Sequence, residues 1–181
     1  MGYTMLTKRT FIGLGFLVLA AACSNVTDIN RAKTDTGPLK LNAVRVDTST
    51  TKNTSNRQIV GISRERLASD LTAALTTKLG AASNPNGLPS NVNVTVKEVH
   101  LADIVERALV GTSYIVSTIS VTDAATGEVI IAPTEVKADS EQLRAGGMLG
   151  VVTTKSVEND YKLAVQGYAD ALVASLVASK K

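Results

Sequence analysis

The chain has 181 residues, with 19 basic and 16 acidic side chains, a formal net charge of +3, one cysteine and no tryptophan. Lys8 and Arg9 supply two of the basic residues and every acid lies after Cys23, so the chain from Cys23 onward is nearly neutral. This balance excludes recognition of nucleic acid through a basic patch. The lone cysteine excludes an intramolecular disulfide, and the scarcity of aromatic residues argues against ring platforms for sugars or single-stranded nucleic acid.

The first element is an apolar run at residues 11–22, directly after a basic pair. The run is well short of the about 20 residues that a helix needs to cross a bilayer. A basic start, a short apolar middle and a small-residue end are typical of a secretory signal peptide. We therefore expect residues 1–22 to be a signal peptide.

Three alanines, residues 20–22, directly precede Cys23, and this stretch resembles the lipobox of bacterial lipoproteins, although Leu19 lies one place earlier than the usual leucine. In the alternative, an ordinary secreted protein, the lone thiol would be a liability in an oxidising compartment. The resemblance implies a permanent anchor of several acyl chains, palmitate among them, on Cys23. Ser24, in place of an aspartate, implies the periplasmic face of a Gram-negative outer membrane.

Residues 24–38 are polar and have no periodicity, so residues 23–38 are expected to form an acylated cysteine and a flexible tether. Flexible-chain scaling gives such a tether a span of about 20 Å. Residues 39–178 are then expected to form a single periplasmic domain.

The domain begins with an expected strand at residues 39–47, in which the apolar phase changes after Ala43 and indicates a bulge. Residues 48–57 contain no apolar side chain and are expected to be a solvated loop.

Residues 63–79 carry apolar side chains at helical spacing and are expected to form a helix. Ser63 is a suitable N-cap, Glu65 lies in the expected first turn and Lys78 in the last, and Gly80 is expected to end the helix in a left-handed conformation.

After a turn-rich connection at residues 80–91, alternating valines from Val92 predict a half-buried strand. Residues 102–110 fit either a helical turn or a loop. Residues 112–133 predict a hairpin whose turn runs from Asp123 to Glu128, with a positive φ at Gly127.

Residues 157–179 predict a final helix with a continuous apolar stripe, preceded by Ser156 as its N-cap. The order of elements indicates an α+β fold: a mixed, mostly antiparallel sheet with two main helices packed on one face.

The glycine-rich stretch before the last helix nearly fits a dinucleotide fingerprint, but residue 145 is alanine and no clear strand precedes it. We expect a flexible or close-packed loop and no cofactor. Its apolar residues Met148, Leu149 and Val151 are candidates for contact with a partner.

His100 is the single histidine, and Ser63 and Ser113 each begin like the nucleophile elbow G-x-S-x-G without its second glycine. A hydrolase would need His100 beside a serine and an acid. No metal site is expected, because a second histidine and a free cysteine are both missing.

Two segments, "VTDAATGEVI" and the "GGMLG" that precedes the long final helix, are similar to those in envelope lipoproteins related to the CsgG and TolB amino-terminal domain superfamily. This resemblance covers about residues 39–177 and implies an assembly, scaffold or accessory role without catalysis. The long membrane-inserting hairpins of the secretion pore are missing, so no channel is expected.

The leading hypothesis is a non-enzymatic lipoprotein of the outer membrane whose tethered domain binds an envelope protein or a second copy of itself. One alternative is a small-ligand carrier with an apolar cleft between sheet and helices. The other is the His100-dependent hydrolase.

Overall fold

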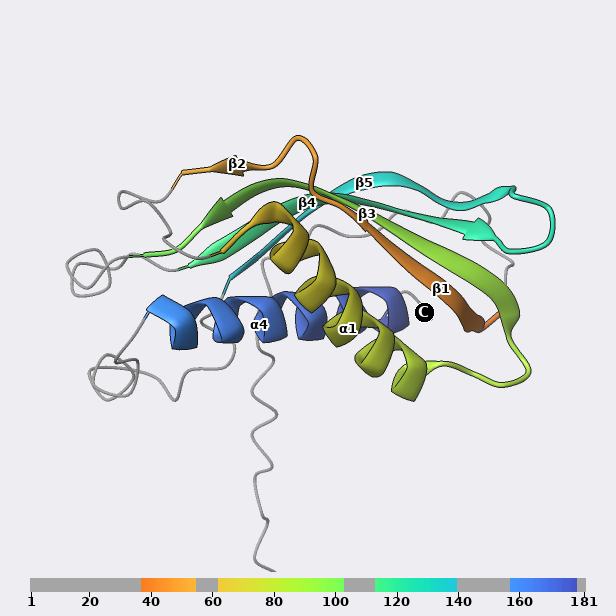
Figure 1. Cartoon of the computed structure of the whole chain (residues 1–181). Helices are drawn as coiled ribbons and strands as arrows, with labels where there is room; N and C mark the ends of the chain where they lie inside the picture. The colour runs from red at the N-terminus through yellow and green to blue at the C-terminus, as the bar shows by residue number, and fades with distance from the viewer. Residues whose placement is uncertain (1–36, 55–61, 103–112, 140–156, 179–181) are drawn as a thin grey trace, which may run out of the picture.

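The computed structural model describes residues 37–54, 62–102, 113–139 and 157–178. These residues form a sheet with two helices packed on one face (Figure 1). The strands are β1 (Leu39–Asp47), β2 (Lys52–Asn53), β3 (Leu88–His100), β4 (Tyr114–Asp123) and β5 (Val129–Asp139). The helices are α1 (Arg64–Ala82) and α4 (Val157–Ala178). The expected α+β class, with a mostly antiparallel mixed sheet and two helices, is confirmed.

The strands lie in the order β1-β3-β4-β5, and β2 also pairs with β3. Strands β1 and β2 both run parallel to β3, whereas β3, β4 and β5 are antiparallel neighbours. Because β1 and β3 are parallel, the chain has to return from the end of β1 to the start of β3, a distance equal to the length of the strands. Helix α1 makes this return.

The two edges of the sheet are irregular. On β1 the pairing shifts between Leu41 and Ala43, which confirms the expected bulge, and the Asn42 side chain donates to Asn91 Oδ1 at 2.8 Å. On β5 the pairing shifts near Pro133, which has no N–H to give to a ladder. Bulges and prolines at edges discourage the pairing of one sheet with another.

Helix α1 begins as expected, because Ser63 Oγ accepts from the Arg66 N–H at 3.1 Å. The expected end was wrong: the helix continues to Ala82, so Gly80 lies inside it. It stops at Ser83, whose backbone is extended and whose N–H donates to the Gly80 carbonyl at 3.2 Å. The proline at position 85 prevents the helix from continuing.

Two expected loops contain more structure than their polar residues suggested. Within residues 48–57, Thr48 and Thr51 are buried. Thr51 Oγ1 donates to the Val96 carbonyl at 2.9 Å, and β2 begins at the next residue. Strand β3 begins at Leu88, four residues before Val92, because Leu88 pairs with the start of β1. Both differences arise from pairing across the sheet, which local composition does not reveal.

The hairpin between β4 and β5 has the expected turn. Asp123 Oδ1 accepts from the backbone N–H groups of Ala125 and Thr126, at 2.7 and 3.0 Å, and Gly127 has a φ of 75°. The N–H of Asp123 donates to the Glu128 carbonyl at 2.8 Å.

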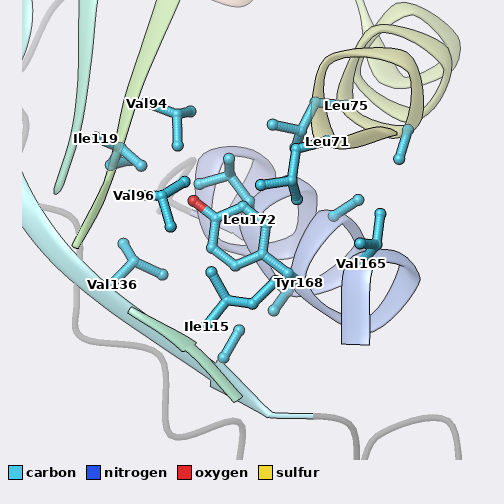
Figure 2. Close-up of a cluster of buried hydrophobic side chains, with 14 of the residues drawn as sticks. Leu71, Leu75, Val94, Val96, Ile115, Ile119, Val136, Val165, Tyr168 and Leu172 are labelled. Carbon is cyan, nitrogen blue, oxygen red and sulfur yellow. The ribbon is translucent and has the colours of Figure 1, made fainter. Parts of the chain in front are cut away.

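The core lies between the sheet and the helices (Figure 2). It is built from aliphatic side chains, with Tyr168 at its centre and fully buried. The Tyr168 hydroxyl pairs with Ser117 Oγ at 2.6 Å, and burial raises the pKa of this phenol. The largest aliphatic members that Figure 2 labels come from both helices and three strands: Leu71, Leu75, Val94, Val96, Ile115, Ile119, Val136, Val165 and Leu172.

The start of β1 is fixed on both of its sides. The Leu88 N–H donates to the Pro38 carbonyl at 2.9 Å, and the Asn84 N–H donates to the Leu39 carbonyl at 3.1 Å. The chain at Gly87 packs so closely on β1 that an added Cβ would lie 2.3 Å from the Pro38 oxygen. The point at which the domain joins its N-terminal segment is therefore firmly held.

We expect Gly87→Ala to lower the free energy of unfolding by about 1 to 3 kcal/mol, because the new methyl group has to push β1 aside. Gly80→Ala is the matched control: nothing lies within 4 Å of its Cβ position, and alanine in a helix should raise stability by about 0.5 to 1 kcal/mol. Urea unfolding of the two variants measures the difference. Equal effects at both positions would contradict the close approach.

Candidate functional site

The direction of the strands gives the domain two distinct ends. At one, the tether end, lie Pro38, the link between α1 and β3 at residues 83–87, and the hairpin turn at residues 124–128. The Ala124 N–H donates to the Pro89 carbonyl at 2.9 Å, which joins the hairpin turn to the start of β3. The expected lipid anchor would join the domain here.

At the opposite end, the distal end, β3 finishes and β4 begins, since His100 pairs with Tyr114. Strand β5 finishes beside them, because Tyr114 also pairs with Asp139. Helix α1 begins there, where Thr48 Oγ1 donates to the Arg64 carbonyl at 3.0 Å. The connections at residues 55–61, 103–112 and 140–156 therefore all leave and rejoin the described domain at the distal end.

A group of polar side chains lies at the distal end on the sheet face opposite the helices. We call it the rim cluster: Thr54, Glu98, His100, Tyr114 and Lys137. The imidazole of His100 stacks on the Tyr114 ring at 5.0 Å between centroids, and Lys137 Nζ lies 4.1 Å from the centre of that ring.

The carboxylate of Glu98 joins the rim cluster through two hydrogen bonds. The Tyr114 hydroxyl and Thr54 Oγ1 each donate to Glu98 Oε1 at 2.8 Å. These bonds, led by that of Tyr114, hold the pKa of Glu98 below its ordinary value. His100 Nδ1 lies 3.2 Å from the Thr54 carbonyl, so the cluster also holds the end of β2 against β3.

On the helix side of the same end lies a second polar group, which is buried. Ser113 and Asp160 are both fully buried, and Ser113 Oγ donates to Asp160 Oδ2. The Ala102 N–H donates to the same Ser113 oxygen at 3.0 Å. A buried carboxylate is costly unless it is hydrogen-bonded, so this group fixes α4 against the junction of β3 and β4.

The structure places the residues of the expected hydrolase site apart from one another. His100 belongs to the rim cluster, whereas Ser113 points to the helix layer and is bonded to Asp160. Ser63 is the N-cap of α1. Among the described residues, His100 is brought beside neither elbow-like serine.

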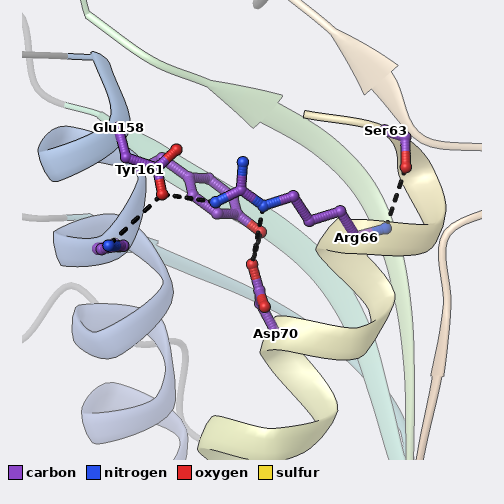
Figure 3. Close-up of polar contacts among 6 residues, drawn as sticks. Ser63, Arg66, Asp70, Glu158 and Tyr161 are labelled. Atoms are coloured by element: carbon purple, nitrogen blue, oxygen red, sulfur yellow. Dashed lines mark hydrogen bonds and ion pairs between the residues drawn. The ribbon is translucent and has the colours of Figure 1, made fainter. Parts of the chain in front are cut away.

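The two helices are joined by charged side chains at their distal ends (Figure 3). Arg66 of α1 donates to Glu158 of α4 at 2.5 Å and lies 3.5 Å from Asp70. Its guanidinium also lies over the Tyr161 ring, 5.2 Å from the centroid, and the Tyr161 hydroxyl donates to Asp70 Oδ2 at 2.8 Å. Each of these groups is satisfied within the domain, so the network is a helix–helix contact.

Two spaces lined by described residues could be considered for a ligand. One apolar slot at the tether end has a volume of about 50 Å³. A groove of about 370 Å³ between α1 and α4 is open and lined by ion-paired side chains such as Lys78, which bonds Asp170. Carrier pockets of about 300 to 1,000 Å³ enclose most of their ligand, so the slot is too small, and the groove has the volume but lies open between the helices.

The residues singled out from sequence have different outcomes. Cys23, Met148, Leu149 and Val151 lie outside the described residues, so their roles stay predictions. Within the described ranges, no group of three or more potential metal ligands is found, and no helix is long and apolar enough to cross a membrane.

Sequence patterns did not reveal the rim cluster. The bulge between Val96 and Glu98 shifts the alternation of β3, so the face on which His100 lies could not be read from sequence. The signal for Tyr114 was present: it alternates with the buried Ile115 and therefore belongs to the opposite face.

Comparison with known proteins finds distant likenesses of fold. No protein-family model and no curated protein matches the chain. It is similar to a variant of PelC, a dodecamer, from Paraburkholderia phytofirmans, with a TM-score of 0.41, 11% identity and coverage of 83% of this chain and 96% of that one. It is also similar to a candidate lipoprotein from Caulobacter crescentus CB15, with a TM-score of 0.36, 13% identity and coverage of 72% and 89%. The CsgG and TolB resemblance is not shown by these matches and stays a prediction.

The pKa of Glu98 is lower in the folded chain than its ordinary value of 4.5, so the ionised carboxylate stabilises the fold. We expect the free energy of unfolding to decrease below about pH 4.5, as the pH falls toward and through the folded pKa and this charge is lost. Tyr114→Phe removes the main donor while retaining the ring between His100 and Lys137. Urea unfolding from pH 7 to pH 3 should show a shallower acid dependence in this variant. An unchanged slope would show that the hydrogen bond does not affect Glu98.

Proposed function

We propose that this chain is a lipoprotein anchored through Cys23 to the periplasmic face of the outer membrane, and that its domain binds an envelope protein through the distal end without catalysis. The observation that carries the proposal is the polarity of the domain. The N-terminal segment joins at one end of the sheet, and three connections depart from the other.

The dimensions support an outward-facing distal end. Strand β3 has 13 residues, and at about 3.3 Å per residue it spans about 40 Å. The tether expected from sequence spans about 20 Å. Since it joins at Pro38, the tether end stays nearer the lipid, and the distal end reaches toward the periplasm.

The distal end has the features of a presentation scaffold. Binding residues in many proteins lie on loops that a rigid framework positions. Here the framework is fixed by the rim cluster on one sheet face and by the bonds of Ser113 to Asp160 and Ala102 on the other. The sequence of the connection at residues 140–156 includes Met148, Leu149 and Val151, which suit contact with an apolar protein surface.

The placement of His100 and Ser113 favours binding over catalysis. A serine hydrolase needs the histidine within hydrogen-bond reach of the nucleophile. Ser113 is instead bonded to Asp160 in the interior, and His100 lies on the other face of the sheet. The carrier alternative is less well supported, because the apolar slot holds only about 50 Å³ and the larger groove between α1 and α4 is open.

Lipid attachment is tested first with Cys23→Ala. Growth with an alkyne analogue of palmitate should label the wild-type chain and leave the variant unlabelled, because the thiol is the expected attachment point. Separation of inner and outer membranes by density should place the wild-type chain with the outer membrane. Equal labelling of the two forms would contradict an anchor at Cys23.

The partner surface is tested by photo-crosslinking in intact envelopes, with a photoreactive residue at Leu149 or, as a control, at Ala82 near the tether end. We expect one discrete protein adduct from position 149 in the acylated chain. That adduct should be lost in Cys23→Ala, which no longer reaches the envelope partner.

Two outcomes would contradict the distal binding surface. One is an adduct from position 82 that equals or exceeds the adduct from position 149. The other is the absence of any discrete adduct from position 149 in an acylated, correctly localised chain.

A further inference from the structure

We propose that the tether end of the domain rests on the lipid surface, with Val129 entering the boundary between headgroups and acyl chains and the apolar recess beside Leu39 and Leu41 placed next to the lipid. This inference rests on the proposed function, since it requires the anchor at Cys23. It adds a second, non-covalent contact that would orient the domain.

The first observation is the apolar slot. It lies where β1 begins and α1 ends, and its walls include Leu39, Leu41, Leu79 and Leu176. Leu79 and Leu176 are buried, whereas Leu39 and Leu41 remain half-buried. The slot is therefore an apolar recess that stays partly open beside the attachment point.

The second observation is Val129. It is the one large hydrophobic side chain found exposed among the described residues, at 46%. It follows the hairpin turn at residues 124–128 and therefore lies at the tether end as well. Leu39 and Leu41 of the slot lie on β1 and Val129 lies on β5, which are opposite edge strands, so apolar side chains are found toward both edges of this end.

The short chain before the domain favours lipid as the surface that this end contacts. Fourteen residues lie between Cys23 and Pro38, a span of about 20 Å for a flexible chain. That is about half the length of β3, so the anchor holds this end of the domain at high effective concentration beside lipid. A second copy fits less well, because a stable interface buries about 800 Å² on each partner, and the apolar features found at this end are one small recess and one valine.

Charge contributes little to this contact. Lys40 is exposed at the tether end, but Glu128 is exposed at the same end and opposes it. We therefore expect contact through apolar groups, which anionic lipid and salt would change little.

The experiment uses the full acylated chain in vesicles of phosphatidylethanolamine and phosphatidylglycerol. Since Cys23 is the sole cysteine and is acylated, a cysteine introduced elsewhere is a unique thiol for a fluorophore. Ala82→Cys and Ala125→Cys place the fluorophore at the tether end, and Lys52→Cys places it near the distal end. All three positions are exposed.

A lipid that carries a quencher in its headgroup should reduce fluorescence at positions 82 and 125 several-fold more than at position 52. Adding Val129→Asp to the chain labelled at position 82 should reduce that quenching at least two-fold, whereas Val129→Leu should retain it. Equal quenching at all three positions would overturn the lipid contact.

A separate readout distinguishes the two proposals. If Cys23 of the wild-type chain reacts with the fluorophore, it is not acylated, and the proposed anchor and the lipid contact both fail. If Cys23 is unreactive and quenching is equal at all three positions, the anchor stands and the contact alone fails.

Discussion

The parallel pairing of β1 with β3 is the constraint on which the rest of the domain depends. Because of it, α1 has to run back along the length of the strands, so Pro38 and the end of α1 lie at the same end of the domain. The antiparallel strands that follow place the β4–β5 turn at that same end. The three long connections are left to the other end, and the domain acquires a polarity from its first strand pair.

In the proposed lipoprotein, this polarity would separate attachment at one end of the domain from binding at the other. The tether end is tightly built, with Asn84 and Leu88 bonded to the carbonyls at the start of β1. The distal end is fixed by polar groups on both faces of the sheet, including the buried bond between Ser113 and Asp160. Under the proposed function, the first end would bear the anchor and the second would hold the connections toward a partner.

The core shows how a domain with few aromatic residues fills its interior. Small and branched side chains fill the space between sheet and helices, and Tyr168 occupies the centre. Its hydroxyl would be costly to bury alone, and Ser117 supplies the partner. At the helix ends, Tyr161 is covered by the guanidinium of Arg66.

Periodicity in the sequence was sufficient to predict the helices, the hairpin and the fold class, because each depends on local patterns. Asp123 and Gly127 favour a turn through their own local chemistry. Strand β2 and the rim cluster could not be predicted, because they depend on pairing between distant residues. Thr54 and Glu98 are 44 positions apart, and the bulge after Val96 changes the face to which the later residues belong. Gly80 shows the same limit: glycine after an apolar stripe often ends a helix, yet α1 continues to Ala82, where the chain has to pass along the start of β1 and the Leu41 N–H donates to Ser83 Oγ at 2.8 Å.

The most direct test of the proposed function is hydrogen–deuterium exchange of the acylated chain in native outer membranes, compared with the same chain purified in detergent. A domain that binds its partner through the distal end should gain protection in peptides that include Ile62, Ser113 and Val157, with little change along the middle of the open sheet face. Protection concentrated on that sheet face, or none at all in the membrane sample, would contradict a distal binding surface.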